Sequence, residues 1–276
     1  MIKISQIIAT PDMPKVANRY LYMGEVEDNV AKVAAAGFDG VELKIGDPES
    51  FDEEGLARAL EAHRLELACI NSGRLMSQFG LTLLHPRKEV RTEALRKLQA
   101  MVKIAGRHRS SVNIGLFRGA ALEGKPIAHT RDLFVDVLKE VCDVAGRLGV
   151  FINFEPTNRF EINFINTTDE GLDIVQRVNR PNLGLLLDLY HIYIEDADMA
   201  ESIRKASGIV RHFHFADTDR LPPGVSHGEI DFASLIRLLK EVGYTGFLTV
   251  SGVPTENVGE SVKKTSAFLR GLINET

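Results

Sequence analysis

The sequence predicts an α/β fold, a single (β/α)8 TIM barrel that spans residues 1–276. Short apolar runs alternate with longer amphipathic runs along the whole chain, and each kind occurs eight times in 276 residues. This is the count and the length of a (β/α)8 barrel. The longest irregular segments follow predicted strands, so in a barrel they gather at the end where active sites lie. A doubly wound open sheet is the alternative, but the first strand-to-helix connection lacks the GxGxxG pattern.

The predicted strands are mostly apolar without alternation, as expected of parallel strands that are buried on both faces. They span residues 2–8, 40–44, 65–71, 111–117, 150–155, 183–188, 210–215 and 246–251. The predicted helices span residues 25–36, 52–63, 87–108, 129–147, 168–178, 198–206, 231–242 and 257–273. Thr168 and Asp231 suit helix N-termini. Three glycines follow helices at the place of a left-handed cap: Gly37, Gly149 and Gly243.

Composition and charge exclude several classes of partner. A net charge of −5 and a pI near 5.9 argue against nucleic acid or an anionic membrane. The two cysteines, Cys69 and Cys142, lie far apart and predict neither a structural zinc site nor a disulfide framework. The N-terminus lacks a signal-peptide pattern, and no apolar run reaches membrane-spanning length. We therefore expect a cytoplasmic protein that binds neither membrane nor nucleic acid.

Three predicted strands end in side chains that can bind a divalent metal. Glu155, Asp188 and His214 each close an apolar run, whereas the last run, 247–250, closes with Ser251. Carboxylate and imidazole ligands around an open position suit Mn²⁺, Mg²⁺, Co²⁺ or Zn²⁺. Each residue also has a plainer explanation, since an acid after a strand often caps a helix and a single histidine is often a packed polar side chain. From the residues alone, both explanations stay open.

Three ordered motifs indicate a family. Residues 155–161 read EPTNRFE, residues 188–191 read DLYH, and residues 212–220 read HFHFADTDR. Together they resemble the motifs of the xylose-isomerase-like TIM-barrel family of sugar (phosphate) isomerases and epimerases. Residues 81–86 (LTLLHP) and 114–119 (IGLFRG) are similar to its ketose 3-epimerase and 5-keto-gluconate epimerase branch. The resemblance covers nearly the whole chain and is more specific for the family than for the substrate.

The resemblance implies a role for each strand-end residue. It implies that Glu155, Asp188 and His214 are metal ligands, that Glu155 is also the catalytic base, and that the partner is a small sugar. A metal chelated by a ketose carbonyl and its neighbouring hydroxyl acidifies the intervening C–H and stabilises an enediolate. A carboxylate beside the metal can remove that proton. The resemblance also implies a homo-oligomer.

Other polar residues are expected to bind the substrate. The resemblance assigns the sugar oxygens to Glu161, His191 and Arg220. Arg118, which follows a predicted strand, could bind a substrate carboxylate or phosphate bidentately or could pair with a loop acid, and both interpretations stay open.

Ser251 departs from the family pattern. The resemblance implies a glutamate there, which would be both the fourth metal ligand and a second base on the opposite face of the substrate carbon. A serine hydroxyl is a weak ligand and no base at neutral pH. His227 or Glu229, in the loop after 212–220, could substitute, although a solvated histidine and a helix-start glutamate explain them more simply.

Three functions follow from these residues. The first is a metal-dependent isomerase or epimerase of a keto sugar or keto sugar acid that acts through an enediolate. The second is a one-base lyase or dehydratase on a related sugar, because elimination after α-proton removal also needs one base and a metal. The third is a catalytically inactive, sugar-binding or partner barrel that lost its chemistry with the missing glutamate.

Overall fold

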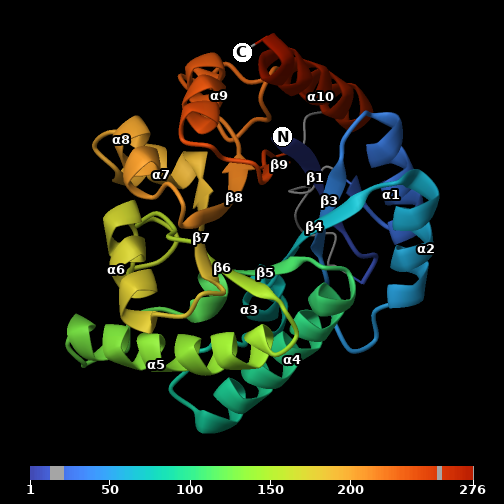
Figure 1. The fold of residues 1–276 in the computed structure, drawn as a ribbon. Helices are drawn as coiled ribbons and strands as arrows, with labels where there is room; N and C mark the ends of the chain where they lie inside the picture. The colour runs from blue at the N-terminus through green and yellow to red at the C-terminus, as the bar shows by residue number, and fades with distance from the viewer. Residues whose placement is uncertain (13–21, 254–256, 276) are drawn as a thin grey trace.

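Eight parallel strands close into a barrel with the helices outside it (Figure 1). The computed structural model describes residues 1–12, 22–253 and 257–275. The strands follow one another around the ring in chain order, and β1 closes it by pairing with β9. The barrel strands are β1 (Lys3–Ala9), β3 (Gly40–Lys44), β4 (Glu66–Asn71), β5 (Ser111–Ile114), β6 (Phe151–Phe154), β7 (Leu183–Asp188), β8 (Val210–Phe215) and β9 (Phe247–Val250). The predicted (β/α)8 barrel is confirmed.

The helices that cover the barrel match the amphipathic runs of the sequence. Each predicted helix is present within about two residues of its expected bounds. These helices are α1 (Val26–Ala35), α2 (Glu53–His63), α4 (Lys88–Arg107), α5 (Ile127–Gly146), α6 (Thr168–Val178), α8 (Met199–Lys205), α9 (Phe232–Glu241) and α10 (Val258–Glu275). Asp231 caps α9 as expected, whereas α6 is capped by Thr167 in a capping box with Glu170, one residue before the expected start.

The described residues contain four short elements that the sequence did not predict. They are β2 (Tyr22–Met23), which pairs with β1 outside the ring, α3 (Gly73–Phe79), η1 (Leu116–Arg118) and α7 (Leu189–Glu195). The predicted strand 111–117 is therefore too long, because Gly115 turns the chain into η1 after Ile114. Except for β2, these elements follow barrel strands, so they help to build the carboxyl-terminal face.

The barrel interior is polar near its carboxyl end, and its outer surface is apolar. In β8, His212 and His214 point toward Glu42 in the barrel interior, and Phe213 and Phe215 alternate with them on the outer face, where they contact Tyr244 and Phe232. Phe215 packs against Phe232 of α9, with ring centroids 5.9 Å apart. Apolar contacts therefore hold the helices against the barrel, and polar side chains in the interior are available to form a site. No helix in the described ranges is both long enough and apolar enough to cross a membrane.

Candidate active site

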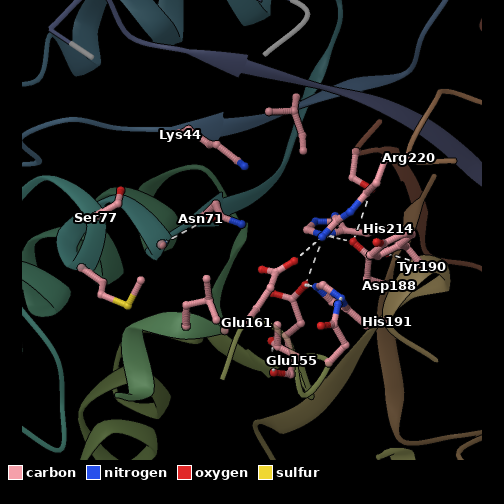
Figure 2. Close-up of a pocket in the computed structure, with 18 of the residues that line it drawn as sticks. Lys44, Asn71, Ser77, Glu155, Glu161, Asp188, Tyr190, His191, His214 and Arg220 are labelled. Carbon is pink, nitrogen blue, oxygen red and sulfur yellow. Dashed lines mark hydrogen bonds and ion pairs between the residues drawn. The ribbon is translucent and has the colours of Figure 1, made fainter. Parts of the chain in front are cut away.

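A cavity of about 650 Å³ opens at the carboxyl ends of the barrel strands. Its lining includes Glu155 after β6, Asp188 at the end of β7, His214 in β8 and Ser251 after β9. Figure 2 shows Glu155, Asp188 and His214 turned toward one another on one wall. The side chains that the strand-end pattern selected therefore share one pocket.

Three atoms of this wall converge without bonding to one another. His214 Nδ1 lies 3.6 Å from Glu155 Oε1 and 3.6 Å from Asp188 Oδ2. Both distances are too long for a hydrogen bond, but they suit atoms that share one small cation. All three side chains are buried, so water cannot fully screen this concentration of negative charge.

The protein fixes the second polar atom of each carboxylate. Asn113 donates its side-chain N–H to Glu155 Oε2 at 2.8 Å, and the main-chain N–H of Tyr190 donates to Asp188 Oδ1 at 2.9 Å. A Cβ atom at position 115 would collide with the Glu155 carboxylate, so Gly115 makes room for this side chain. Each carboxylate is thereby oriented with one oxygen toward the common centre.

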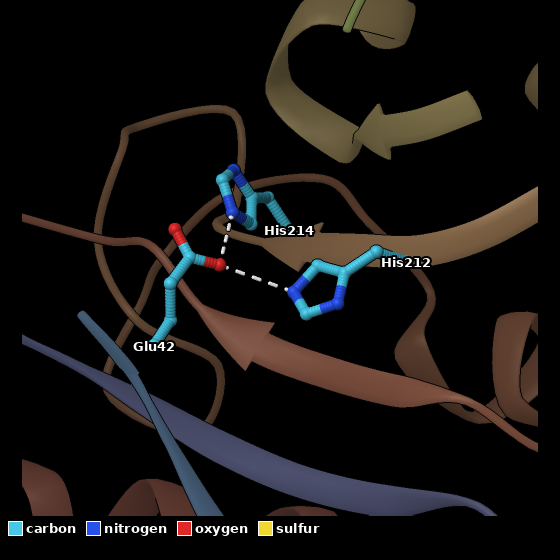
Figure 3. A group of neighbouring side chains, drawn as sticks. All are labelled: Glu42, His212 and His214. Atoms are coloured by element: carbon cyan, nitrogen blue, oxygen red, sulfur yellow. Dashed lines mark hydrogen bonds and ion pairs between the residues drawn. The ribbon is translucent and has the colours of Figure 1, made fainter. Parts of the chain in front are cut away.

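Glu42 binds the His214 ring at Nε2, the nitrogen that points away from Glu155 and Asp188. His214 Nε2 lies 2.8 Å from Glu42 Oε2, and His212 Nε2 lies 3.1 Å from the same oxygen (Figure 3). Glu42 is fully buried in β3, and its other oxygen accepts a hydrogen bond from Asn71. The carboxylate fixes the imidazole so that Nδ1 faces Glu155 and Asp188, as the outer-shell partner of a metal-binding histidine does.

The charges at this wall determine which groups are ionised. Burial alone would raise the pKa of Glu42, but the His214 charge and the two imidazole hydrogen bonds outweigh burial and lower that pKa. Burial would likewise lower the pKa of His214, but Glu42, Asp188 and Glu155 raise it well above its usual range. The pKa values of Glu155 and Asp188 are lowered in spite of burial, chiefly by the neighbouring imidazoles. The site therefore favours ionised carboxylates, the form that binds cations, and a protonated His214, whose Nδ1 proton a bound cation would displace.

The residues expected to bind the sugar lie around these carboxylates. His191 pairs its Nδ1 with the Asn158 amide at 2.8 Å, and its Nε2 lies 3.8 Å from Glu155 Oε1. Arg220 forms an ion pair with Glu161, and its guanidinium lies 3.9 Å from the ring centroid of Tyr190. The structure thus brings His191, Arg220 and Glu161 into the same pocket as the three converging atoms.

Comparison with known proteins gives the family. The model of the xylose isomerase-like TIM barrel family matches residues 30–272. The chain belongs to this family. An L-ribulose 3-epimerase of Mesorhizobium japonicum is 32% identical over 252 residues, which cover 90% of this chain and 82% of that protein. A ketose 3-epimerase of Arthrobacter globiformis is 29% identical over 246 residues, which cover 88% of this chain and 83% of that protein.

Solved structures agree on the fold. The crystal structure of D-allulose 3-epimerase from Methylomonas sp. in complex with D-allulose superposes with a TM-score of 0.79 at 22% identity. The match covers 98% of this chain and 97% of that chain. The sequence relatives identify the chain as an isomerase- or epimerase-like enzyme of the xylose isomerase-like family.

The converging atoms also fit the divalent metal that this family implies. Two carboxylate oxygens and one imidazole nitrogen form a donor set that suits Mn²⁺, Mg²⁺, Co²⁺ or Zn²⁺. Glu155, Asp188 and His191 form one group whose metal-binding atoms lie close together, so His191 also lies near the converging atoms, and Glu42, His212 and His214 form a second such group. Its members already lie at hydrogen-bond distance, and His212 Nε2 also pairs with Thr249 Oγ1 at 2.6 Å. This second group is satisfied as a hydrogen-bonded layer.

Ser251 lies at the same pocket. It directly follows β9, is half-buried, and its Oγ lies 3.5 Å from Asp188 Oδ2. The main-chain N–H of Ser251 donates to the Phe215 carbonyl, which holds this residue at the end of the barrel. In this member of the xylose isomerase-like family, the end of the last strand therefore presents a hydroxyl beside the converging carboxylates.

His227 and Glu229 do not reach the converging atoms. Both are exposed, and neither is among the described residues that line the cavity. The main-chain N–H of His227 donates to Asp219, and the Glu229 carboxylate accepts from the Tyr193 hydroxyl. The structure does not support the hypothesis that either residue replaces a glutamate at position 251.

Arg118 is the one expected binding residue that the structure places away from the pocket. It is fully buried, and its guanidinium donates to the carbonyls of Gly115, Glu155, Phe164 and Ile165 at distances of 2.9 to 3.2 Å. Burial lowers its pKa to about 9. Neither expected role fits this position, because the donors bind the main chain rather than a substrate anion or a loop acid. Arg118 instead holds the loop after β6, which begins with Glu155.

We expect Arg118→Met to destabilise the protein, because it leaves these buried carbonyls without donors. Several lost hydrogen bonds to a charged group predict a fall of about 3 kcal/mol or more in the free energy of unfolding. Chemical denaturation followed by circular dichroism measures this fall. Arg109→Met, which changes an arginine in the turn after α4, serves as the control. A variant as stable as the parent would mean that the guanidinium is not needed to hold the loop.

Proposed function

We propose that this enzyme is a metal-dependent isomerase or epimerase of a keto sugar or keto sugar acid that uses one base, Glu155. The observation that supports it best is the convergence of Glu155 Oε1, Asp188 Oδ2 and His214 Nδ1 on one centre. A bound divalent cation would polarise the substrate carbonyl and so acidify the neighbouring C–H.

Glu155 has the position and charge of a base at this centre. Its Oε2 is held by Asn113, so only Oε1 faces the cavity side of the cluster. Its lowered pKa keeps the carboxylate ionised, which is the form that can accept a proton. His191 and Arg220 bring hydrogen-bond donors to the same pocket, where they would orient the sugar hydroxyls and the oxygen that gains charge.

Ser251 limits the stereochemistry of the reaction. Two-base epimerisation needs an acid–base group on each face of the carbon, and a serine hydroxyl at the end of β9 cannot supply the second. A single carboxylate can move a proton between adjacent carbons on one face. We therefore place isomerisation ahead of epimerisation. A one-base lyase or dehydratase remains the second candidate. Elimination needs only one base, and Glu155 is present although position 251 is a serine.

Solvent exchange tests the proposed function. Metal-loaded protein is incubated in D₂O with neutral ketoses and with keto sugar acids, and ¹H NMR follows loss of the proton next to the carbonyl. We expect exchange that stops after chelation and returns when metal is restored. An isomeric product supports isomerisation, and loss of water identifies a dehydratase. No exchange with any substrate of the panel at any of the four metals would refute the proposal and favour an inactive, sugar-binding barrel.

We expect Glu42→Gln to weaken metal binding without unfolding the protein. The amide keeps the shape and an acceptor for His214 Nε2 but removes the charge that orients the imidazole. Loss of such an outer-shell partner costs about 10- to 100-fold in metal affinity. Isothermal titration with Mn²⁺ measures it, with Glu66→Gln, a partly exposed glutamate of β4, as the control. Equal Mn²⁺ affinity in the two variants would show that Glu42 only packs the core.

A further inference from the structure

His191 lies at the same wall of the cavity as the converging atoms. Its Nε2 is 3.8 Å from Glu155 Oε1, and Glu155, Asp188 and His191 form one of the two groups of described residues with metal-binding atoms. Figure 2 shows its ring beside both carboxylates. Distance alone therefore allows two roles, a further metal ligand or a hydrogen-bond donor to the substrate. The position of the ring proton distinguishes them.

The main chain fixes the orientation of the Asn158 side chain, which binds the His191 ring. The N–H of Phe160 donates to Asn158 Oδ1 at 3.0 Å, and the other end of the amide, Nδ2, lies 2.8 Å from His191 Nδ1. The opposite orientation of the amide would set its NH₂ group against the N–H of Phe160, and both can only donate. Asn158 Nδ2 is therefore the donor and His191 Nδ1 the acceptor.

The loop that carries Asn158 is itself held in place. The Asn158 carbonyl accepts from the main-chain N–H groups of Glu161 and Ile162, at 3.0 and 3.2 Å. Asn166 donates its side-chain N–H to the Thr157 carbonyl at 2.6 Å. The side chains of Asn158 and His191 are both buried, so bulk water has little access to the contact between them. The amide therefore meets the imidazole in one fixed geometry.

This contact fixes the proton of His191 on the nitrogen that faces Glu155. A neutral imidazole has one N–H and one bare nitrogen, and a second N–H at Nδ1 would oppose the N–H of Asn158. With Nδ1 as the acceptor, Nε2 carries the proton and has no lone pair for a cation. His214 is held in the opposite way, because Glu42 accepts from its Nε2 and leaves Nδ1 for a cation. The partners of the two rings thus separate a metal ligand from a donor.

We propose that Asn158 is a positioning residue that holds His191 in the Nε2–H form, so that His191 donates a hydrogen bond to a substrate oxygen and does not bind the metal. The donation to the substrate rests on the proposed function, whereas the position of the ring proton does not. The oxygen next to the carbon that loses its proton gains negative charge. A donor that is oriented before the reaction stabilises that charge.

Nitrogen-15 NMR of metal-free protein that is labelled at its 8 histidines locates the ring protons. The chemical shifts distinguish a bare ring nitrogen from a protonated one, and His191→Gln identifies the signals of His191. We expect a bare Nδ1 and a protonated Nε2. Zn²⁺, a diamagnetic ion, should leave this pattern unchanged while it shifts the Nδ1 signal of His214. A proton on His191 Nδ1, or an Nε2 that loses its proton when Zn²⁺ binds, would overturn the proposal.

Asn158→Asp reverses the contact with a small change in shape. The carboxylate still accepts from Phe160, but its other oxygen accepts from His191 Nδ1, so the proton should move to Nδ1. We expect exchange in D₂O at saturating substrate and Zn²⁺ to fall by about 10²-fold, the effect of losing one oriented donor. Asn163→Asp is the matched control, because Asn163 is an exposed residue of the same loop that also accepts from a main-chain N–H, that of Ala121. It should match the parent in both measurements.

The spectra and the exchange rates separate this proposal from the proposed function. The expected ring pattern without exchange on any substrate would refute the proposed function and leave the assignment of the His191 proton in place. Exchange by a protein whose His191 Nε2 is bare would refute the role of Asn158 alone. An Asn158→Asp variant that gains the Nδ1 proton but exchanges as fast as Asn163→Asp would overturn the donation to the substrate.

Discussion

Replacing Glu155 with glutamine is expected to reduce proton exchange at the substrate C–H by on the order of 10³-fold or more. The amide cannot accept the proton, and general-base catalysis alone contributes about 10² to 10⁴. The new side chain should stay in place, because its amide oxygen can still accept from Asn113, which now donates to Glu155 Oε2. Exchange into D₂O at saturating metal, followed by ¹H NMR, measures the loss.

Asp188→Asn is the matched control for Glu155→Gln. Both changes remove one charged metal ligand, but only the change at Glu155 removes the base. At metal concentrations that saturate each variant, Asp188→Asn should recover part of the exchange, whereas Glu155→Gln should not. Full exchange by Glu155→Gln would refute the role of Glu155 as the base. Equal losses of exchange in both variants would mean that Glu155 acts only by binding the metal.

Replacing Ser251 with glutamate is expected to create the missing second base. The new carboxylate would start from a residue whose Oγ lies 3.5 Å from Asp188 Oδ2, so it can reach the converging atoms. We expect Mn²⁺ affinity to rise about tenfold or more, since a further negative charge is placed within a few ångströms of the cation. Epimerisation should rise by roughly 10² or more, because a positioned acid–base group contributes that much.

Ser251→Ala separates the new carboxylate from the loss of the hydroxyl. It should leave metal affinity and product pattern close to those of the parent, because the serine is only a weak ligand. Titration calorimetry gives the affinities, and chromatography of the sugars gives the ratio of epimer to isomer. Unchanged affinity and an unchanged ratio in Ser251→Glu would show that the site is built differently from the family pattern.

The sequence predicted the barrel because the signals for it are local. A run such as Leu183–Asp188 is apolar throughout and fully buried, so a parallel strand covered on both faces is its simplest interpretation. The short helices α3 and α7 were not predicted, because each begins within two residues of a strand end, in a segment that was interpreted as the connection to the next helix. Gly73 begins α3 two residues after the end of β4, in a segment expected to be a long loop, and Leu189 begins α7 directly after β7.

The pocket residues could be predicted as a set because barrel topology brings strand ends together. Glu155, Asp188 and His214 were selected as chemically suitable side chains at three such ends, and they share one cavity. The contact between Glu42 and His214 could not be predicted in the same way. It meets His214 across 172 residues of sequence and from the interior of β3, so no local pattern joins the two.

The sequence pattern also does not predict the direction in which a long side chain points. Arg118 follows a predicted strand as an anion-binding arginine would, but η1 turns it into the protein, where main-chain carbonyls bind its guanidinium. Lys44 ends a strand in the same way and points into the cavity. The two differ because Lys44 is still in register on β3, whereas Arg118 lies beyond the end of β5.

Anomalous diffraction from crystals soaked in Mn²⁺ tests the central claim most directly. The described part of the barrel has two groups with metal-binding atom types, Glu155 with Asp188 and His191, and Glu42 with His212 and His214. The proposed function predicts one Mn²⁺ peak bounded by Glu155 Oε1, Asp188 Oδ2 and His214 Nδ1, each about 2.0 to 2.3 Å from the ion. Ser251 should lie beside the ion without a carboxylate at the fourth protein position. A peak among Glu42, His212 and His214, or no peak at saturating Mn²⁺, would contradict it.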